Sequence, residues 1–451
     1  MKILKSKLLC LLIAGYFCVF SQNLFALTPK VEEASIDSSP FENWAIHGQF
    51  TNVTQHHPSF ISPYSGQNSL IFNGRTEETS DLTLYAGLHI WPDAELWINP
   101  EVDQGFGLSN AVGLAGFSSG EAYKIGENTP YLRIPRAFLR QVIPLGKSQE
   151  RITSAANQLA DYKSIDNVTL TIGKFAVTDI FDTNTYAHDP RLEFLNWSVI
   201  DAGAFDYAAD AWGFTYGTAV ELTQTSWTLR SGIFQLSKVP NGKITGIDFS
   251  QFMFVNEIEK RYRCNGHPGK LKILVFANHG YMADYRDALR LAQFKNDIPD
   301  VSLVRLSNWR PGVSINLEQE LTSDLGAFAR ASVNDGSKEA YEFTDINRSL
   351  SLGLVLKGNR WGREKDTFGI AAVVNSLSND ARKYFEDGGI GILIGDGNMH
   401  YGDEKIVEAY YSATLNEHLT LSLNYQHVND PAYNHDRGPV SIFGIRLHVE
   451  F

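Results

Sequence analysis

The segment Leu419-Thr420-Leu421-Ser422-Leu423-Asn424-Tyr425-Gln426 carries an apolar side chain at every second position and a polar one between. Successive side chains of a β-strand point to opposite faces, so this alternation predicts a strand with one apolar and one polar face. The same pattern recurs at residues 82–90, 168–172 and 350–356. The chain is therefore predicted to consist mainly of β-strands.

Working outward from this stretch, about sixteen segments show such alternation, which lies within the even strand numbers of bacterial outer-membrane barrels. They are residues 43–54, 80–91, 93–102, 131–143, 166–176, 211–223, 225–236, 249–260, 270–280, 311–322, 325–334, 347–358, 366–376, 404–415, 417–428 and 440–451. Some connections are very short and others are long, notably 55–79, 103–130, 177–210 and 377–403. That asymmetry is also typical of such barrels. Residues 283–296 are predicted to form a short helix in a loop or plug.

The last segment indicates which face of each strand is wet. Apolar residues alternate there with polar or small ones up to the terminal Phe451. A barrel of about sixteen strands has a lumen too wide for side chains to fill, so its apolar stripes are expected to face lipid. The predicted fold is all-β, a transmembrane antiparallel β-barrel of about 16 strands with long inward-folding loops. A secreted soluble β-helix or multi-sandwich protein is the structural alternative.

Aromatic residues near the predicted strand ends are expected to form a girdle at the membrane interface. They are Trp44, Trp91, Trp212, Trp227, Tyr410, Tyr411, Tyr425, Phe443 and Phe451. The alternative is the general preference of aromatic residues for strands.

Residues 1–26 have the order of a secretory signal peptide: a basic start, an apolar run at 8–20 and a cleavage-like end. The run is too short to span a membrane, and no long apolar run follows it. We expect an exported chain with an N-terminal extension at 27–41 and a barrel at 42–451. Its predicted location is the Gram-negative outer membrane, where it contacts lipid and lipopolysaccharide.

Composition excludes other classes. Acidic residues number 51 against 39 basic ones, and a nucleic-acid partner needs a basic excess. Cys10, Cys18 and Cys264 are the three cysteines, and Cys264 is the one that remains after removal of the signal peptide, which excludes a disulfide framework.

Two segments are predicted to line the pore. On one, Glu95, Trp97, Asn99, Glu101 and Asp103 share a face, where carboxylates and amides exchange hydrogen bonds with hydroxyls and the indole stacks on a sugar ring. On the other, one face carries Arg136, Phe138 and Arg140. We expect acidic and basic walls that face each other across a constriction. Charged walls are also found in general porins, so a pore without sugar selectivity is the alternative interpretation.

The loop 179–197 is rich in charged residues, including Arg191, which we include among the pore-lining candidates. Ion pairs that fold this loop against the wall are favoured over a calcium site, because the EF-hand spacing is absent. His188-Asp189 raises the question of a hydrolase triad, but the chain has no Gly-x-Ser-x-Gly motif. We predict no enzyme, no cofactor and no metal.

Phrases along the whole chain resemble the carbohydrate-selective porin family, often called the OprB family. They include residues 44–49, 62–66, 99–109, 186–191, 206–210, 316–319, 341–345 and 434–440. The resemblance implies a sixteen-stranded outer-membrane barrel, narrowed by inward-folded loops, that passes monosaccharides such as glucose by diffusion. Of the pore-lining candidates, the resemblance supports only the segment 101–107.

Sugars are thus the expected permeants, and a general or anion-preferring porin is the alternative. A C-terminal strand that ends in Phe451 is the kind that barrel-assembly machinery accepts, and a homo-oligomer is possible.

Overall fold

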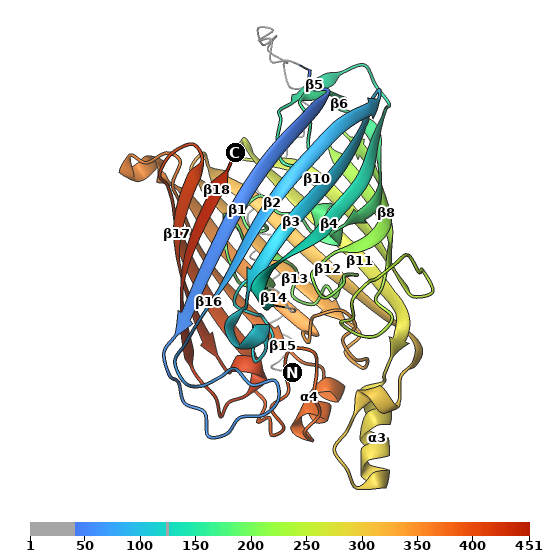
Figure 1. Ribbon diagram of the computed structural model, residues 1–451, viewed down its shortest axis with the longest axis vertical. Helices are drawn as coiled ribbons and strands as arrows, with labels where there is room; N and C mark the ends of the chain where they lie inside the picture. The colour runs from blue at the N-terminus through green and yellow to red at the C-terminus, as the bar shows by residue number, and fades with distance from the viewer. Residues whose placement is uncertain (1–40, 123–125) are drawn as a thin grey trace.

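The computed structural model describes residues 41–122 and 126–451, which form one closed antiparallel barrel of sixteen strands (Figure 1). The barrel strands are β1 (Trp44–His57), β2 (Arg75–Trp91), β3 (Ala94–Gly105), β4 (Glu127–Pro144), β7 (Asn167–Phe175), β8 (Thr215–Gln224), β9 (Trp227–Gln235), β10 (Phe252–Cys264), β11 (His267–Met282), β12 (Leu306–Thr322), β13 (Leu325–Asn334), β14 (Arg348–Lys357), β15 (Thr367–Ser376), β16 (Glu404–Thr414), β17 (Leu419–Asn429) and β18 (Val440–Glu450). Each predicted strand has its counterpart, so the predicted fold class is confirmed.

The first and last strands close the barrel. β1 pairs with β18 in an antiparallel register that runs from Gln49 opposite Glu450 to His56 opposite Phe443. The backbone of Phe451 continues this seam, because its N–H donates to the carbonyl of Gly48 at 2.9 Å. The remaining strands each pair with their neighbours along the chain.

The two ends of the barrel differ. Long loops and the helices α3 (Tyr285–Lys295) and α4 (Asn379–Glu386) gather at one end, the bottom of Figure 1. α3 confirms the helix predicted at 283–296. The other end has short turns, except for two connections. Residues 358–366 connect β14 to β15 and contain a 3-10 helix (Gly358–Trp361), and a hairpin of β5 (Gln149–Ile152) and β6 (Asp161–Ser164) connects β4 to β7. The predicted signal peptide and almost all of the predicted extension lie outside the described residues.

The outer face of the barrel is apolar. On β14, Leu350, Leu352 and Leu354 are 51, 55 and 43% exposed, whereas Ser349 and Ser351, which alternate with them, are buried on the lumen side. A soluble barrel would have the opposite arrangement, which excludes the soluble alternative. Among the described residues, no helix has the length and hydrophobicity to cross a membrane.

Several residues of the predicted aromatic girdle lie on the outer face of the barrel. Trp44, Trp91 and Phe443 are more than half exposed on the outer face. The prediction is wrong for Tyr410. This side chain points into the lumen and packs edge-on against Phe194, with the two ring centres 4.8 Å apart. The prediction is also wrong for Trp212. This residue lies in the loop between β7 and β8, where its indole donates a hydrogen bond to the hydroxyl of Tyr131.

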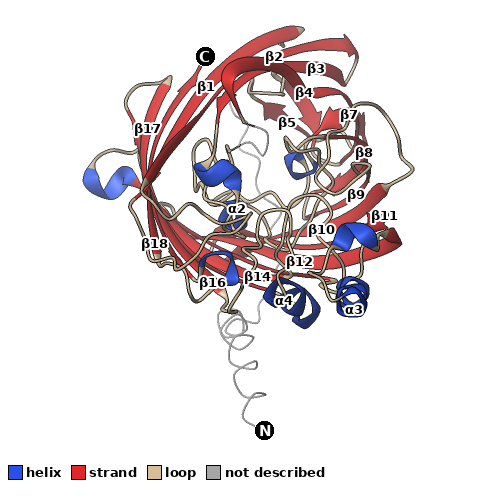
Figure 2. Ribbon diagram, turned by 60° about the horizontal axis from the view of Figure 1, so that its bottom comes forward, coloured by secondary structure: helices blue, strands red, loops and turns tan. Residues whose placement is uncertain are grey.

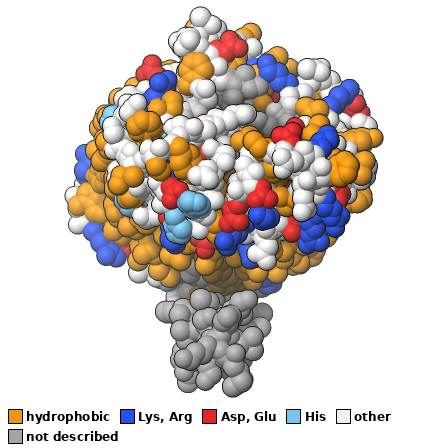
Figure 3. All heavy atoms as spheres, turned by 90° about the horizontal axis from the view of Figure 1, so that it is seen from below, with side chains coloured by type: hydrophobic (Ala, Val, Ile, Leu, Met, Phe, Trp, Pro, Cys, Tyr) orange, Lys and Arg blue, Asp and Glu red, His pale blue; other side chains and the backbone are white. Residues whose placement is uncertain are grey.

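Loops fill much of the barrel interior (Figure 2). Four aromatic side chains from two of these loops are fully buried: Phe181, Phe194, Phe205 and Tyr341. The loop from β7 to β8 also contains the short helix α2 (Trp197–Ile200), whose Asn196 caps the backbone N–H of Ser198. Seen from the loop end, acidic, basic and histidine side chains lie beside one another on the surface (Figure 3). These loops define the route that a solute could take.

Candidate permeation pathway

The charged residues predicted for the pore lie on two neighbouring strands. β3 pairs with β4 so that Glu95 is opposite Arg140 and Asn99 is opposite Arg136. Arg140 Nη1 lies 3.3 Å from Glu95 Oε2. The prediction of walls that face each other across the lumen is therefore wrong. Consecutive strands of an antiparallel barrel are hydrogen-bonded neighbours, so these charges meet side by side.

Arg133 is a lumen residue that the alternation did not identify. Its Nη2 lies 2.5 Å from Glu101 Oε1, and its Nε contacts the Asp103 carboxylate. Arg133 and Arg136 have opposite parity in the sequence, yet a register shift in the pairing of β3 with β4 lets both face the lumen. Pro135 within the strand was the available signal, because proline in a sheet commonly marks a bulge.

Trp97 faces the lumen but is covered. Its side chain lies over Gly87 on β2, where an added Cβ would come within 2.5 Å of the indole, and it is 0% exposed. The indole Nε1 donates to Glu95 Oε2 at 2.9 Å. Asn99 is equally buried and donates to the side-chain oxygen of Asn157 at 2.9 Å. In this conformation both side chains support the wall, and neither presents a free face to a solute.

Residues 176–214, here named the lumen loop, cross the interior of the barrel between β7 and β8. Near its start, the Asp179 carboxylate accepts two hydrogen bonds from the Arg136 guanidinium, at 2.6 and 2.8 Å. Such a bidentate pair fixes both the distance and the orientation of the two groups. Arg136 and Asp179 thus join the wall and the lumen loop at one point.

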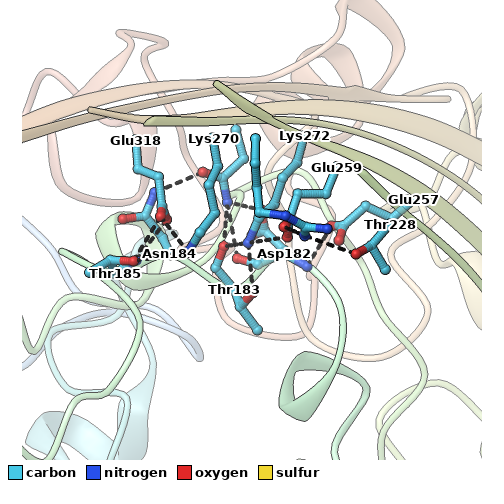
Figure 4. A network of polar contacts seen from close by, with 12 residues as sticks. Asp182, Thr183, Asn184, Thr185, Thr228, Glu257, Glu259, Lys270, Lys272 and Glu318 are labelled. Carbon is cyan, nitrogen blue, oxygen red and sulfur yellow. Dashed lines mark hydrogen bonds and ion pairs between the residues drawn. The ribbon is translucent and has the colours of Figure 1, made fainter. Parts of the chain in front are cut away.

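The next residues of the lumen loop are bonded to the wall formed by β10, β11 and β12 (Figure 4). Lys272 Nζ donates to the hydroxyl of Thr183 at 2.6 Å. The backbone N–H and hydroxyl of Thr185 donate to the two oxygens of Glu318, at 2.8 and 2.7 Å. These contacts hold the tip of the loop against one side of the lumen.

A buried arginine holds the middle of the lumen loop. Arg330 on β13 is 2% exposed, and its guanidinium donates to the carbonyls of Val199 and Ala187 at 2.9 and 2.8 Å. Its Nε also lies 3.3 Å from the fully buried carboxylate of Asp182. Arg330 therefore binds three separate points of the loop at once.

Arg191 joins the lumen loop to the acidic side of the barrel. Its guanidinium lies 3.6 Å from Asp81, 3.7 Å from Glu101 and 3.4 Å from Glu121. The prediction that ion pairs fold this loop against the wall is confirmed. Among the described residues, no cluster of three or more His, Cys, Asp or Glu side chains has the geometry of a metal site.

Two cavities meet at the lumen loop. An outer cavity of about 270 Å³ is bordered by Arg133, Arg136 and Arg191. An inner cavity of about 450 Å³ is bordered by Phe138 and Arg140. Two residues of the lumen loop border both cavities. They are Asp179 and His188. The constriction between the cavities is therefore formed by these residues together with Arg136.

The charge state of the constriction follows from its contacts. Burial by itself raises the pKa of Asp179, but the Arg136 guanidinium outweighs it and holds that pKa below its ordinary value. Burial and the nearby Arg330 cation lower the pKa of His188, so the imidazole is neutral at pH 7. Burial, reinforced by a neighbouring carboxylate, raises the pKa of Asp201 in the outer cavity to about 8.

This last value predicts a pH-dependent ion selectivity. An acid with a pKa of about 8 is mostly neutral at pH 7 and becomes anionic above pH 8, so alkaline pH adds negative charge to the outer cavity. We expect the ratio of K⁺ to Cl⁻ permeability to rise about twofold from about pH 7 to about pH 9. Reversal potentials across planar bilayers in a KCl gradient measure it. Asp201→Asn should remove the rise, and a rise that persists in this variant contradicts the assignment.

A closed sixteen-stranded barrel with an apolar exterior, a charged lumen and an inward-folded loop defines the class of outer-membrane diffusion channels, or porins. The family model described as "Carbohydrate-selective porin, OprB family" matches residues 67–451, and the chain belongs to this family. The protein is thus an outer-membrane channel of Gram-negative bacteria.

Solved structures share the fold. The high-pH structure of Pseudomonas putida OprB superimposes on this chain with a TM-score of 0.68 and 15% sequence identity. The match covers 91% of this chain and 94% of the OprB chain. The outer-membrane channel DcaP of Acinetobacter baumannii is 12% identical, with a TM-score of 0.51 and coverage of 90% and 97%. Porin AaxA of Chlamydia muridarum is 19% identical over 299 residues. That match spans 63% of this chain and 52% of the length of AaxA.

Proposed function

We propose that the channel passes carbohydrates, namely monosaccharides such as glucose, by passive diffusion without a cofactor. The observation that carries this proposal is the composition of the constriction. Arg136 supplies donors, Asp179 supplies acceptors, and the neutral His188 ring supplies one of each. A sugar hydroxyl both donates and accepts, so it can exchange hydrogen bonds with all three.

Aromatic side chains beside the constriction add to this support. Phe214 borders the outer cavity, and the guanidinium groups of Arg133 and Arg136 lie 5.2 and 4.9 Å from its ring centre. Phe138 borders the inner cavity. Apolar ring faces next to charged groups suit a solute whose C–H and O–H surfaces alternate.

The alternative is a general or anion-preferring porin. The observation that favours it is the presence of Arg133, Arg136 and Arg191 around the outer cavity, since clustered cations attract anions. In the proposal, the carboxylates bonded to these arginines offset that attraction.

Swelling of proteoliposomes separates the two functions. We expect glucose to enter several-fold faster than amino acids of similar size. An amino acid carries two charges, and both must lose water to pass the constriction. Equal rates would remove the sugar proposal. Faster entry of anionic solutes than of both would establish the alternative.

The proposal extends to partners. Outer-leaflet lipopolysaccharide would contact the apolar band, and assembly machinery would bind the C-terminal strand ending at Phe451. Association of copies in the membrane belongs to the same set of expectations, which crosslinking in native membranes tests.

A further inference from the structure

The connection from β4 to β7 reaches into the lumen from the short-turn end. It spans residues 145–166 and carries the β5–β6 hairpin (Figure 1). Between the two short strands, the carbonyl of Asn157 accepts a hydrogen bond from Arg140 Nη1 at 2.8 Å, and Leu159 is fully buried. The other connections at this end are shorter, and the longest of them spans residues 358–366, so this insertion is a special feature of the pathway.

The insertion creates a second narrowing. A third cavity, of about 130 Å³, lies between the hairpin and the wall. It shares three bordering residues with the inner cavity: Arg140, Gln158 and Lys163. The inner cavity thus lies between the constriction at Asp179 and a second group of side chains, here named the inner neck.

Lys163 is a partly buried cation that forms no ion pair with a described carboxylate. Among the described residues, no carboxylate oxygen lies within 4.0 Å of its ammonium group. The acids that act on it from further away are Glu95, Glu150 and Glu221. Glu221 is already bonded to Arg230 at 2.9 Å. Even a partly desolvated charge without a partner is unfavourable, so this position favours an incoming anion.

Arg140 adds unused donors at the same place. Its described hydrogen bonds, to the Asn157 carbonyl and to Glu95, are both made by Nη1. Nε and Nη2 have no protein acceptor among the described residues. Arg140 and Lys163 border the same cavity and repel each other electrostatically. An anion between them would relieve that repulsion and accept hydrogen bonds from both.

We propose that the inner neck is a binding site for the carboxylate of a sugar acid, with Arg140 and Lys163 as its ligands and Gln158 as a contact for hydroxyl groups. The inference rests on the proposed function, because it adds a preference among sugar-like permeants. Solutes then meet two filters in series, a balanced ion pair at the constriction and a cationic neck beyond it. The long-range acids around Lys163 keep binding weak enough for release.

Competition in proteoliposomes tests the site with glucose and glucuronate, which differ by one carboxylate. Labelled glucose flux is measured against unlabelled glucose or unlabelled glucuronate as inhibitor. We expect glucuronate to inhibit at about tenfold lower concentration than glucose, as one charge-assisted contact provides. Lys163→Gln should bring this ratio close to one, and Lys163→Arg should retain it.

Lys147→Gln is the matched control, because Lys147 lies exposed in the same connection and borders neither cavity. Heat-modifiable migration in gels verifies that each variant is folded. Equal inhibition by the two sugars, or a ratio unaffected by Lys163→Gln, overturns the inference and leaves the sugar channel intact. If labelled glucose does not enter at all, the proposed function fails. Labelled glucuronate flux that depends on Lys163 would then still support the anion site.

Discussion

Arg330→Met should release the lumen loop and widen the channel. The substitution removes a donor from each of three loop carbonyls and leaves the buried Asp182 carboxylate without its cation. Breaking a buried pair in this way costs about 3–5 kcal/mol. We expect single-channel conductance to rise several-fold and larger oligosaccharides to enter proteoliposomes. The barrel itself should persist, since its strands are held by their backbone ladders.

The matched control for this variant is Arg348→Met. Arg348 is exposed at the start of β14, so the same chemical change there removes no contact to the lumen loop. Conductance and size limit should equal those of the wild type in the control. A wild-type conductance in Arg330→Met, with a folded barrel in gels, would contradict the role assigned to Arg330.

The second large effect is expected at the constriction. Arg136→Leu removes both hydrogen bonds to Asp179 and leaves the Asp179 carboxylate unpaired in the constriction. The several-fold preference for glucose over amino acids should fall close to one, because the constriction loses its donors. The preference for K⁺ over Cl⁻ should increase, because the remaining charge is negative.

A double variant separates charge from hydrogen bonding. Arg136→Leu combined with Asp179→Leu restores the charge balance, so ion selectivity should return towards the wild type while sugar discrimination stays low. Arg263→Leu, exposed at the short-turn end of β10, is the control. Sugar discrimination that survives in both variants would show that the pair does not govern passage.

The strands were predictable because each one separates lipid from water. Successive side chains of a strand face lipid and lumen in turn, so apolar and polar residues alternate in the sequence, as in β14 and β17. The β5–β6 hairpin was missed because its strands have four residues each, too few to show a period. Arg133 was missed because a register shift breaks the parity on which alternation relies.

The path of the lumen loop could not be derived from sequence. Arg330 and Asp182 are far apart in the chain, and nothing local in either segment indicates the other. Charge in the loop did indicate ion pairing with the wall, as Arg191 confirms. The error of the opposed acidic and basic walls has the same origin. Alternation gives the face of a strand, whereas the position of that strand around the barrel depends on pairing.

The seam between β1 and β18 has a consequence for biogenesis. Its partners, such as Gln49 and Glu450, come from the two extremes of the chain, so the cylinder is sealed by the most distant contact it contains. Such contacts carry the largest loop-closure entropy and form late. An unfinished or truncated polypeptide consequently lacks the strand that completes the circle. A continuous wall between lipid and lumen therefore requires β18 to be present and paired with β1.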